Sequence, residues 1–370
     1  MSLLFTPISL RGLALENRIM ISPMCQYSAR DGCASDWHLI HLGSLAQSGA
    51  GLLFLEATAV TPEGRITPAC LGLYSDANEA ALAHVIAAVR RWSRMPLGIQ
   101  LSHAGRKGSS FEPWNGGALM PADSGGWRPV APSAVPHSPG EPSPEALGET
   151  GLRRIRDAFV SSAGRADRVG LEAIELHFAH GYLVHEFLSP LSNRRTDQYG
   201  GSIENRMRFP LEIFDAVRQA WPAEKPLGVR LSATDWIEGG WDLDSSVVLA
   251  QQLKNRGCDW IDCSSGGISR EQKIPLGPGY QVPLARRIRR ETGITTIAIG
   301  LITEPGQAET IISGGDADMV ALARAMLWDP RWAWHAAAEL GGTVQAPKQY
   351  WRSPPRGKQA TLRGSTSGQR

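Results

Sequence analysis

Eight short apolar runs recur along this chain of 370 residues, and longer amphipathic stretches separate most of them. The runs are residues 19–24, 52–60, 97–103, 173–179, 227–233, 260–264, 295–299 and 318–323. Short apolar runs that alternate with amphipathic stretches are typical of the strands and helices of parallel βαβ units. Eight such units predict an α/β fold, a single closed (β/α)8 TIM barrel.

Residues that can take part in chemistry lie at or just past the ends of these runs. In a (β/α)8 barrel the carboxyl ends of the strands meet at one face, where active sites are built. We therefore expect one barrel mouth to gather Cys25, Ala59, Gln100, His103, His177, His180, Arg230, residues 265–267, Gly300 and Arg324.

Four of the intervening stretches have apolar residues at helical spacing. They are residues 76–93, 208–221, 245–256 and 305–313. The first begins with Asp76, a residue type that caps helix N-termini, so we expect Asp76 to be its cap.

A wide gap separates the third run from the fourth, and residues 105–151 fill it with Gly, Pro, Ser and Trp. A disordered linker has such a composition, but it would divide the barrel between two of its strands. Because long loops inside compact folds are usually functional, an ordered excursion that caps the barrel mouth is the favoured interpretation. The barrel domain then spans residues 1–352. Residues 353–370 have the composition of a disordered basic tail.

Composition argues against several classes of protein. A hydrophobic fraction of 42% and a charged fraction of 20% are ordinary for a soluble enzyme. The formal charge is +2, and residues 352–370 contribute +5, so the preceding chain carries −3, which argues against a nucleic-acid surface. The five cysteines never form a CxxC pair, which argues against disulfide frameworks and zinc ribbons and favours a reducing cytoplasm. The start lacks the pattern of a secretory leader, and no apolar run is long enough to predict a membrane span.

His177 and His180 follow the fourth apolar run, and Tyr182 comes two residues later. Two histidines three residues apart could bind a metal, but no cluster of further ligands accompanies them. They could also be core histidines that hydrogen-bond to the backbone. As a neutral pair they could donate two hydrogen bonds to a carbonyl or nitro oxygen, with Tyr182 as a general acid.

Cys25 and Tyr27 close the first run, while Gln100 and Arg230 lie inside the third and fifth. A buried cysteine is usually inert, but at the mouth of a barrel its sulfur could contact a redox ring. Arg230 is costly inside a strand unless it meets an anion or a strong acceptor. It could pair with a carboxylate on an outer helix, or face the mouth and stabilise negative charge on a cofactor.

Gly300 follows the seventh run, and Ala323 and Arg324 follow the eighth. In barrels of this kind these positions commonly hold a phosphate group. The chain has no GxGxxG segment after a strand and no Walker sequence, so a Rossmann or P-loop nucleotide site is not supported.

Seven segments of the chain together resemble the old yellow enzyme family of FMN-dependent ene-reductases, in its bacterial branch of xenobiotic reductases and thermophilic-like members. They are LFTPISLRGLALENRI, SPMCQYS, EATAVTPEGRITP, IQLSHAGRK, ELHFAHGYLVHEFLSPLSNRRTDQYGGSIENRMRF, VRLSATDW and IDCSSGG. The similarity runs from about Leu4 to Arg352. It implies an enzyme of the NADPH dehydrogenase type that binds FMN and uses NADPH or NADH as reductant. The implied substrates are α,β-unsaturated carbonyl or nitro compounds, whose C=C bond receives a hydride from flavin N5.

The resemblance also implies roles for individual residues. The flavin ring would contact Ser22, Pro23, Met24, Cys25, Ala59, Gln100 and Arg230. The ribityl chain and phosphate of FMN would contact Ser265, Gly266, Gly300, Ala323 and Arg324. His177 and His180 would bind the activating oxygen of the substrate, and Tyr182 would donate the proton. Cys25 would also modulate the flavin potential, and Tyr27 and Lys107 would lie near the substrate. Arg352 would reach the site from a second subunit of a homodimer or homotetramer.

The chain departs from the family pattern at Ala323, where most relatives have Gly, and in a tail that continues beyond Arg352. Three other functions remain open from the residues. A dienoyl-thioester reductase of related type would need closely spaced cysteines for an iron–sulfur cluster. A flavin-free, phosphate-binding aldolase or isomerase would need a Lys or a metal cluster in the strands. A catalytically silent barrel could serve as a binding scaffold.

Overall fold

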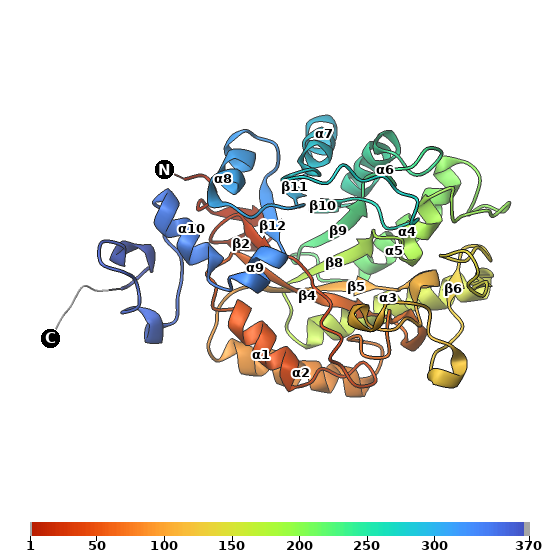
Figure 1. The fold of residues 1–370 in the computed structure, drawn as a ribbon, viewed down its shortest axis with the longest axis horizontal. Helices are drawn as coiled ribbons and strands as arrows, with labels where there is room; N and C mark the ends of the chain where they lie inside the picture. Colours follow the sequence, from red (N-terminus) through yellow and green to blue (C-terminus); the bar gives the residue numbers. More distant parts are fainter. Residues whose placement is uncertain (1, 366–370) are drawn as a thin grey trace.

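The computed structural model describes residues 2–365, and its centre is a closed barrel of eight parallel strands (Figure 1). The strands are β3 (Ile19–Ile21), β4 (Leu52–Ala59), β5 (Leu97–Ser102), β8 (Ala173–Phe178), β9 (Leu227–Ser232), β10 (Ile261–Ser264), β11 (Thr296–Ala298) and β12 (Met319–Leu322). Each strand lies within one of the eight apolar runs, and β12 pairs with β3 to close the ring. The predicted (β/α)8 barrel is therefore confirmed.

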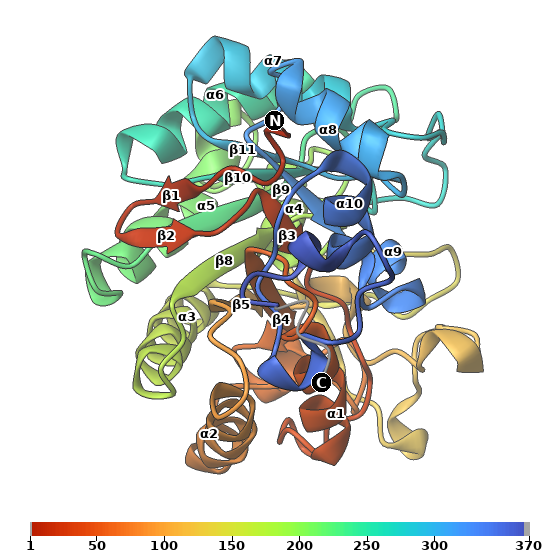
Figure 2. The same ribbon diagram turned by 90° about the vertical axis from the view of Figure 1, so that its left-hand side faces the viewer.

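Helices follow the strands and form an outer layer, which Figure 2 shows around the sheet. They are α1 (Asp36–Leu45), α2 (Asp76–Arg90), α3 (Glu149–Arg168), α4 (Leu183–Leu188), α5 (Ile203–Ala220), α6 (Leu243–Asn255), α7 (Val282–Thr292), α8 (Pro305–Ser313), α9 (Arg324–Trp328) and α10 (Trp332–Leu340). The four helices predicted from apolar spacing are α2, α5, α6 and α8. Within residues 2–365 no helix combines the length and the apolar character that a membrane span requires.

The sequence predicted Asp76 as the N-terminal cap of α2, but the cap is Ser75. Ser75 has an extended backbone, with φ of −139°, and its hydroxyl accepts a hydrogen bond from the backbone N–H of Asn78 at 3.2 Å. Asp76 is already the first helical residue, where its negative charge favours the helix N-terminus. Both residue types are common caps, so their order in the sequence did not decide between them.

A short antiparallel hairpin covers the N-terminal end of the barrel. It consists of β1 (Ile8–Leu10) and β2 (Leu13–Leu15). Its buried Leu10 and Leu15 belong to one apolar cluster with Met20, Phe54 and Trp260 from the strands. These side chains fill this end of the barrel, so the barrel has a packed core there and its opposite end is left for binding.

Residues 103–148 connect β5 to α3 and contain the segment rich in Gly and Pro. Their elements are η2 (Gly105–Lys107), η3 (Pro113–Asn115), η4 (Ala122–Ser124), β6 (Val130–Ala131) and β7 (Glu145–Ala146). Arg106 Nη2 donates a hydrogen bond to the carbonyl of Ile268 at 2.7 Å, and Trp127 Nε1 donates to the carbonyl of Glu63 at 2.9 Å. These bonds connect the excursion to two other loops that follow barrel strands.

The C-terminal segment packs beside α10, at the left of Figure 1 and apart from the centre of the barrel. It contains η5 (Lys348–Tyr350) and η6 (Gln359–Thr361), and Leu362 is buried in a cluster with Ala337 and Val344. Within residues 353–365 Thr361 and Leu362 are buried, and most of the other residues are exposed. The disorder that composition predicts for this segment stays a prediction. Residues 366–370 of the predicted tail lie outside the described residues.

Candidate active site

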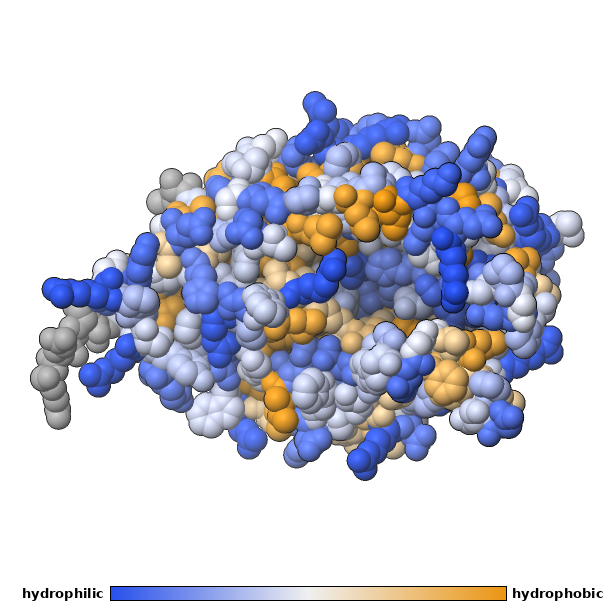
Figure 3. Space-filling model, in the orientation of Figure 1, coloured by the Kyte–Doolittle hydropathy of each residue, from blue (hydrophilic) through white to orange (hydrophobic). Residues whose placement is uncertain are grey.

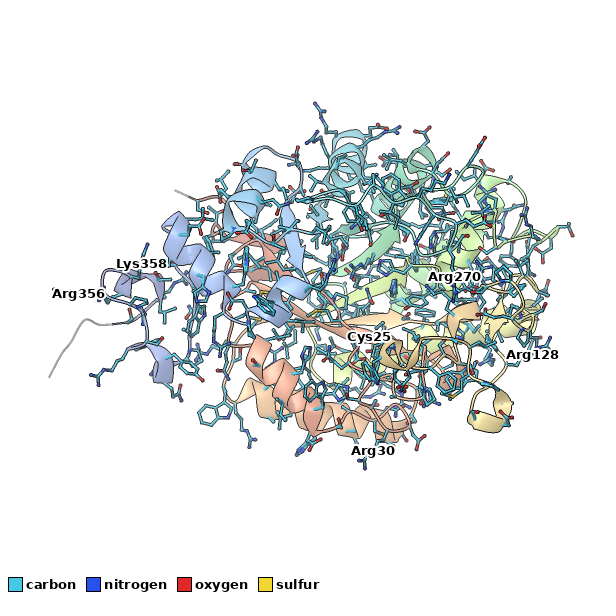
Figure 4. All side chains as sticks on the ribbon, in the orientation of Figure 1. Cys25, Arg30, Arg128, Arg270, Arg356 and Lys358 are labelled. Atoms are coloured by element: carbon cyan, nitrogen blue, oxygen red, sulfur yellow. The ribbon has the colours of Figure 1, made fainter. Side chains whose placement is uncertain are left out.

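The carboxyl ends of the barrel strands surround a hollow, which Figure 3 shows near the middle of the face turned to the viewer. Cys25, which follows β3, is labelled near the middle of the same view in Figure 4. Loops from the excursion and from the β10–α7 connection border this end of the barrel.

His177, His180 and Tyr182 lie together at the end of β8. The ring centroid of His177 is 5.0 Å from that of His180 and 5.0 Å from that of Tyr182, and both pairs meet edge to face. His180 has a left-handed backbone, with φ of 60°, and its Nε2 lies 2.7 Å from the hydroxyl of Ser264 on β10. The Ser232 hydroxyl accepts the backbone N–H of His180 at 2.9 Å. Two neighbouring strands therefore fix the turn that carries the pair.

Both imidazoles are neutral and the phenol keeps its proton at neutral pH. Burial, with the nearby charge of Arg230, lowers the pKa of His177 and His180 well below 6.5. Burial raises the pKa of Tyr182 well above 10. The backbone N–H of Ala179 donates to His177 Nδ1 at 3.2 Å, so the proton of the neutral ring is on Nε2. His177 can therefore donate a hydrogen bond to an acceptor in the mouth.

A buried polar layer lies in the barrel strands next to these residues. Gln100 Nε2 donates to Glu175 Oε1 at 2.8 Å, and Arg230 Nε lies 3.5 Å from Asp262 Oδ2 on the neighbouring strand. Arg230 therefore meets a carboxylate inside the sheet and not one on an outer helix. In strand register Arg230 pairs with His177 on one side and Asp262 on the other.

Glu175 and Asp262 were not among the predicted site residues. Burial, with the charge of Asp262, raises the pKa of Glu175 to about 8. Burial raises the pKa of Asp262 to about 6, although the charge of Arg230 opposes the shift. The signal that identified Arg230, a charge inside an apolar strand, was also present for both acids.

Cys25 and Tyr27 follow β3 at the edge of the mouth. Burial, with the charges of Cys70 and Glu56, raises the pKa of the Cys25 thiol well above 9. The thiol is therefore protonated and is not an activated nucleophile. Tyr27 has a left-handed backbone, with φ of 50°, and its ring lies 5.5 Å from that of Trp114 in the excursion. The excursion therefore extends to the mouth.

A buried pair of side chains, Glu56 on β4 and His38 on α1, supports the loop of Cys25. His38 Nε2 lies 3.1 Å from Glu56 Oε1, and the other carboxylate oxygen accepts the backbone N–H of Gln26 at 3.1 Å. Sequence reasoning missed this pair. Its signal was the glutamate within a run of apolar strand residues.

Gly300 and Ala323 are neighbours because β11 and β12 are adjacent. Gly300 has a φ of 106°, and a Cβ there would lie 2.7 Å from Gln281 Nε2. The Ser265 hydroxyl donates to Gln281 Oε1 at 2.5 Å, which places Ser265 at the same end of the mouth. Ala323 has a φ of −109°, which any residue adopts, so the position does not require glycine. Arg324 begins α9 and is exposed.

The residues present fit FMN. Arg230 is buried, and its Nε lies 3.5 Å from Asp262 without forming a hydrogen bond within residues 2–365, so the guanidinium keeps donor capacity for an acceptor on a bound ring. Gly300 follows β11, and the exposed Arg324 supplies a positive charge at the start of α9, which follows the adjacent strand β12. A flat polar ring and a phosphate group can thus be held at two ends of one mouth.

Most of the remaining predicted residues lie at the ends of barrel strands or in contact with the catalytic residues, and Arg352 does not. Ser22, Pro23 and Met24 lead from β3 to Cys25, Ala59 ends β4, and Gly266 follows Ser265 after β10. Lys107 Nζ donates to the carbonyls of His180 at 2.8 Å and Gly267 at 3.3 Å, and lies 5.0 Å from the centre of the Tyr182 ring. Arg352 is exposed in the C-terminal segment, and the single chain does not bring it to the mouth. No group of three or more possible metal ligands occurs within the described part of the chain.

Comparison with known proteins identifies relatives along nearly the whole chain. Residues 3–341 match the model of the NADH:flavin oxidoreductase / NADH oxidase family. An NADPH dehydrogenase of Geobacillus sp. (strain WCH70) is 45% identical over 353 residues, covering 95% of this chain and 98% of its own. The NADPH dehydrogenase of Bacillus subtilis (strain 168) is 42% identical over 351 residues, covering 94% and 98%. Among solved structures, morphinone reductase in complex with tetrahydroNAD is similar with a TM-score of 0.75, 29% identity and coverage of 97% and 96%.

These matches agree with the barrel and with the family that the seven sequence segments resemble. The chain belongs to the NADH:flavin oxidoreductase / NADH oxidase family, the old yellow enzyme family, and is an FMN-dependent oxidoreductase that uses NAD(P)H.

Proposed function

We propose that this enzyme reduces C=C bonds that are activated by a neighbouring carbonyl or nitro group. The observation that carries the proposal is the neutral His177–His180 pair in contact with the protonated Tyr182. This arrangement offers hydrogen-bond donors for a substrate oxygen and a proton for a carbon, beside residues that fit a flavin ring. The similarity to morphinone reductase supports the same substrate class.

Two histidines polarise the substrate, and a tyrosine transfers the proton. His177 donates from Nε2 to the carbonyl or nitro oxygen and draws electron density away from the double bond, and His180 assists on the same oxygen. Bound FMN supplies the hydride that NADPH or NADH provides. Tyr182 then gives its proton to the carbon next to the activating group.

Other residues position the reactants. Arg230, with Gln100 beside it, would hold the ring edge that carries negative charge after reduction, and Cys25 would contact the ring as a neutral thiol. Ser22, Pro23, Met24 and Ala59 would border the ring, whereas Ser265, Gly266, Gly300, Ala323 and Arg324 would hold the ribityl chain and phosphate. Tyr27 and Lys107 border the substrate. In a homo-oligomer, Arg352 of a second copy would complete the site.

The experiment separates the two half-reactions in a variant with His177→Ala and His180→Ala. Loss of two donors to a developing negative charge should slow reoxidation of the reduced enzyme by 2-cyclohexenone by about 100-fold or more. Reduction by NADPH should change far less, because the nicotinamide becomes a cation as it loses hydride and no negative charge develops on an oxygen of the reductant. Stopped-flow absorbance of the flavin measures both rates. Equal losses in the two half-reactions would contradict the role given to the histidines.

A further inference from the structure

A second cavity lies beside the mouth, between the excursion, the loop after β3, the loop after β4 and the loop after β10. Its volume is about 130 Å³, and its lining includes Tyr27, Arg106, Lys107, His137, Glu141 and Arg270. Tyr27 and Lys107 also border the catalytic mouth, whereas His177 and Tyr182 do not line the cavity. The cavity therefore adjoins the catalytic residues without including them.

Positive charge dominates the lining of this cavity. Three cationic residues, Arg106, Lys107 and Arg270, face one acid, Glu141. Glu141 is partly satisfied because one of its oxygens accepts the backbone N–H of Ser138 at 3.0 Å. Arg270 is exposed and forms no salt bridge within residues 2–365. Figure 4 shows it above the position of Cys25 on the face that carries the hollow.

Two further polar atoms of residues that line the cavity lack partners in the described chain. Arg106 is 6% exposed, its two terminal nitrogens donate to backbone carbonyls, and its Nε has no hydrogen-bond partner in the described chain. His137 Nδ1 is also buried and unpaired there. Burial, with the charges of Lys107, Arg106 and Arg270, lowers the pKa of His137 to about 3, so its ring is neutral and carries one N–H. The unpaired, buried Nε–H of Arg106 beside excess positive charge favours an anionic oxygen group.

The size of the cavity limits what it can hold. Pockets for whole drug-sized ligands usually measure about 300–1,000 Å³, so a cavity of about 130 Å³ accepts a substituent and not a complete dinucleotide. A carboxylate or a phosphate group is of suitable size and charge. The substituent must belong to a molecule whose other part occupies the mouth, because Tyr27 and Lys107 border both spaces.

We propose that this cavity is an anion subsite for a carboxylate or phosphate group attached to a molecule bound in the mouth. The proposal rests on the proposed function and specifies its substrates as activated alkenes that carry a remote anionic group. The same chemistry could come from a phosphate of the nicotinamide dinucleotide. Arg270 at the rim provides the charge that either group would meet first.

The test compares enals that carry a terminal carboxylate on spacers of increasing length with their methyl esters, which have nearly the same shape and no charge. For the spacer that suits the cavity, Arg270→Gln should raise the KM of the carboxylate about tenfold, as loss of a charged hydrogen bond predicts. The KM of the matching ester should stay within about twofold. Arg128→Gln is the matched control, because Arg128 is exposed in the excursion and does not line the cavity.

The outcomes distinguish the sources of the anion. A higher KM for NADPH in Arg270→Gln, with carboxylate and ester unaffected, would assign the subsite to the dinucleotide. No difference between carboxylates and esters at any spacer length, with no change for NADPH, would overturn the proposal.

A binding measurement keeps this result separate from the proposed function. Calorimetric titration of each protein with a saturated carboxylate of the same length does not require turnover, and Arg270→Gln should weaken its binding relative to Arg128→Gln. If neither ester nor carboxylate is reduced but this difference in binding remains, the proposed function fails and the subsite stands. If esters are reduced and the difference is absent, the subsite fails alone.

Discussion

Glu186 on α4 is a buried carboxyl with only one satisfied oxygen. Its Oε1 accepts the backbone N–H of Arg106 at 2.8 Å, whereas Oε2 is buried and has no partner in the described chain. Burial raises the pKa of Glu186 to about 8, although the charge of Arg106 opposes the shift. Between the ordinary pKa of 4.5 and about 8 the folded protein therefore binds a proton that the unfolded chain releases. This group makes the fold less stable as the pH rises through that window.

Replacing this carboxyl with an amide tests its effect on stability. Glu186→Gln keeps the acceptor for Arg106 and removes the titration, so the variant should lose less stability than the native protein between pH 5 and pH 8. Relative to the native protein, the variant should gain about 1–3 kcal/mol in the free energy of unfolding between pH 5 and pH 8, because the raised carboxyl pKa costs the native fold stability over this window and the amide does not titrate. Denaturant unfolding at both pH values measures it, with the exposed Glu238→Gln as control. A constant difference between Glu186→Gln and the native protein at the two pH values would show that Glu186 does not titrate in this window.

At the scale of single residues, the sequence predicted which residues take part in chemistry better than it predicted which side chains they contact. Arg230 was recognised as a charge that needed an acceptor, but its pairing with Asp262 depends on strand register and on which side chains face inward. His177 and His180 were predicted together because they are close in sequence. Arg352 was assigned from a likeness that involves a second subunit, and one chain does not test it.

At the scale of elements, two loops meet at one point with no room for a side chain. A Cβ on Gly267, after β10, would lie 2.5 Å from the Cα of His180, and Gly267 has a φ of 97°. Gly181 is similarly close to the carbonyl of Gly267, at 2.1 Å. The position of His180 therefore depends on glycine in both loops.

Gly267→Ala should displace His180 and the carbonyl that Lys107 contacts. We expect activity with 2-cyclohexenone to fall by about tenfold or more, because small displacements of a catalytic group are costly. The control is Gly277→Ala in the same β10–α7 loop, where a Cβ would meet no atom within 4 Å. Steady-state rates and circular dichroism measure activity and folding. Full activity in a folded Gly267→Ala protein would show that the loop contact does not position His180.

Strands and helices could be predicted because their apolar periodicity is local in the sequence. The course of residues 103–148 could not be predicted, because it depends on individual hydrogen bonds between residues far apart in the sequence, such as that from Arg106 to the carbonyl of Ile268. The side cavity was missed for the same reason. Its cations come from segments more than a hundred residues apart, and no spacing rule connects Lys107 with Arg270.

At the scale of the whole molecule, the C-terminal segment contributes to the stability of the barrel. Leu362 is 2% exposed and packs against Val344. The Val344 N–H donates to the carbonyl of Thr361 at 2.9 Å. Arg363 forms a salt bridge with Glu16 at 2.5 Å. A chain that ends at Arg352 loses all of these contacts.

The truncated protein should unfold more easily than the full chain, by about 2–3 kcal/mol, the range for exposing one buried leucine together with minor contacts. Leu362→Ala in the full chain should reproduce most of the loss, whereas Leu276→Ala, at a leucine that is 72% exposed, should not. Denaturant unfolding measures the three proteins. Equal stability of the truncated and full chains would mean that the packed segment adds nothing to the fold.

The excursion is inserted between β5 and β8, which remain adjacent and in register, with Gln100 opposite Glu175. The hydrogen bonds that close the barrel therefore do not depend on the length or sequence of residues 103–148. Evolution or an engineer can exchange this insert for that of another barrel and alter which molecules are accepted, while the hydrogen bonds between the strands are inherited unchanged.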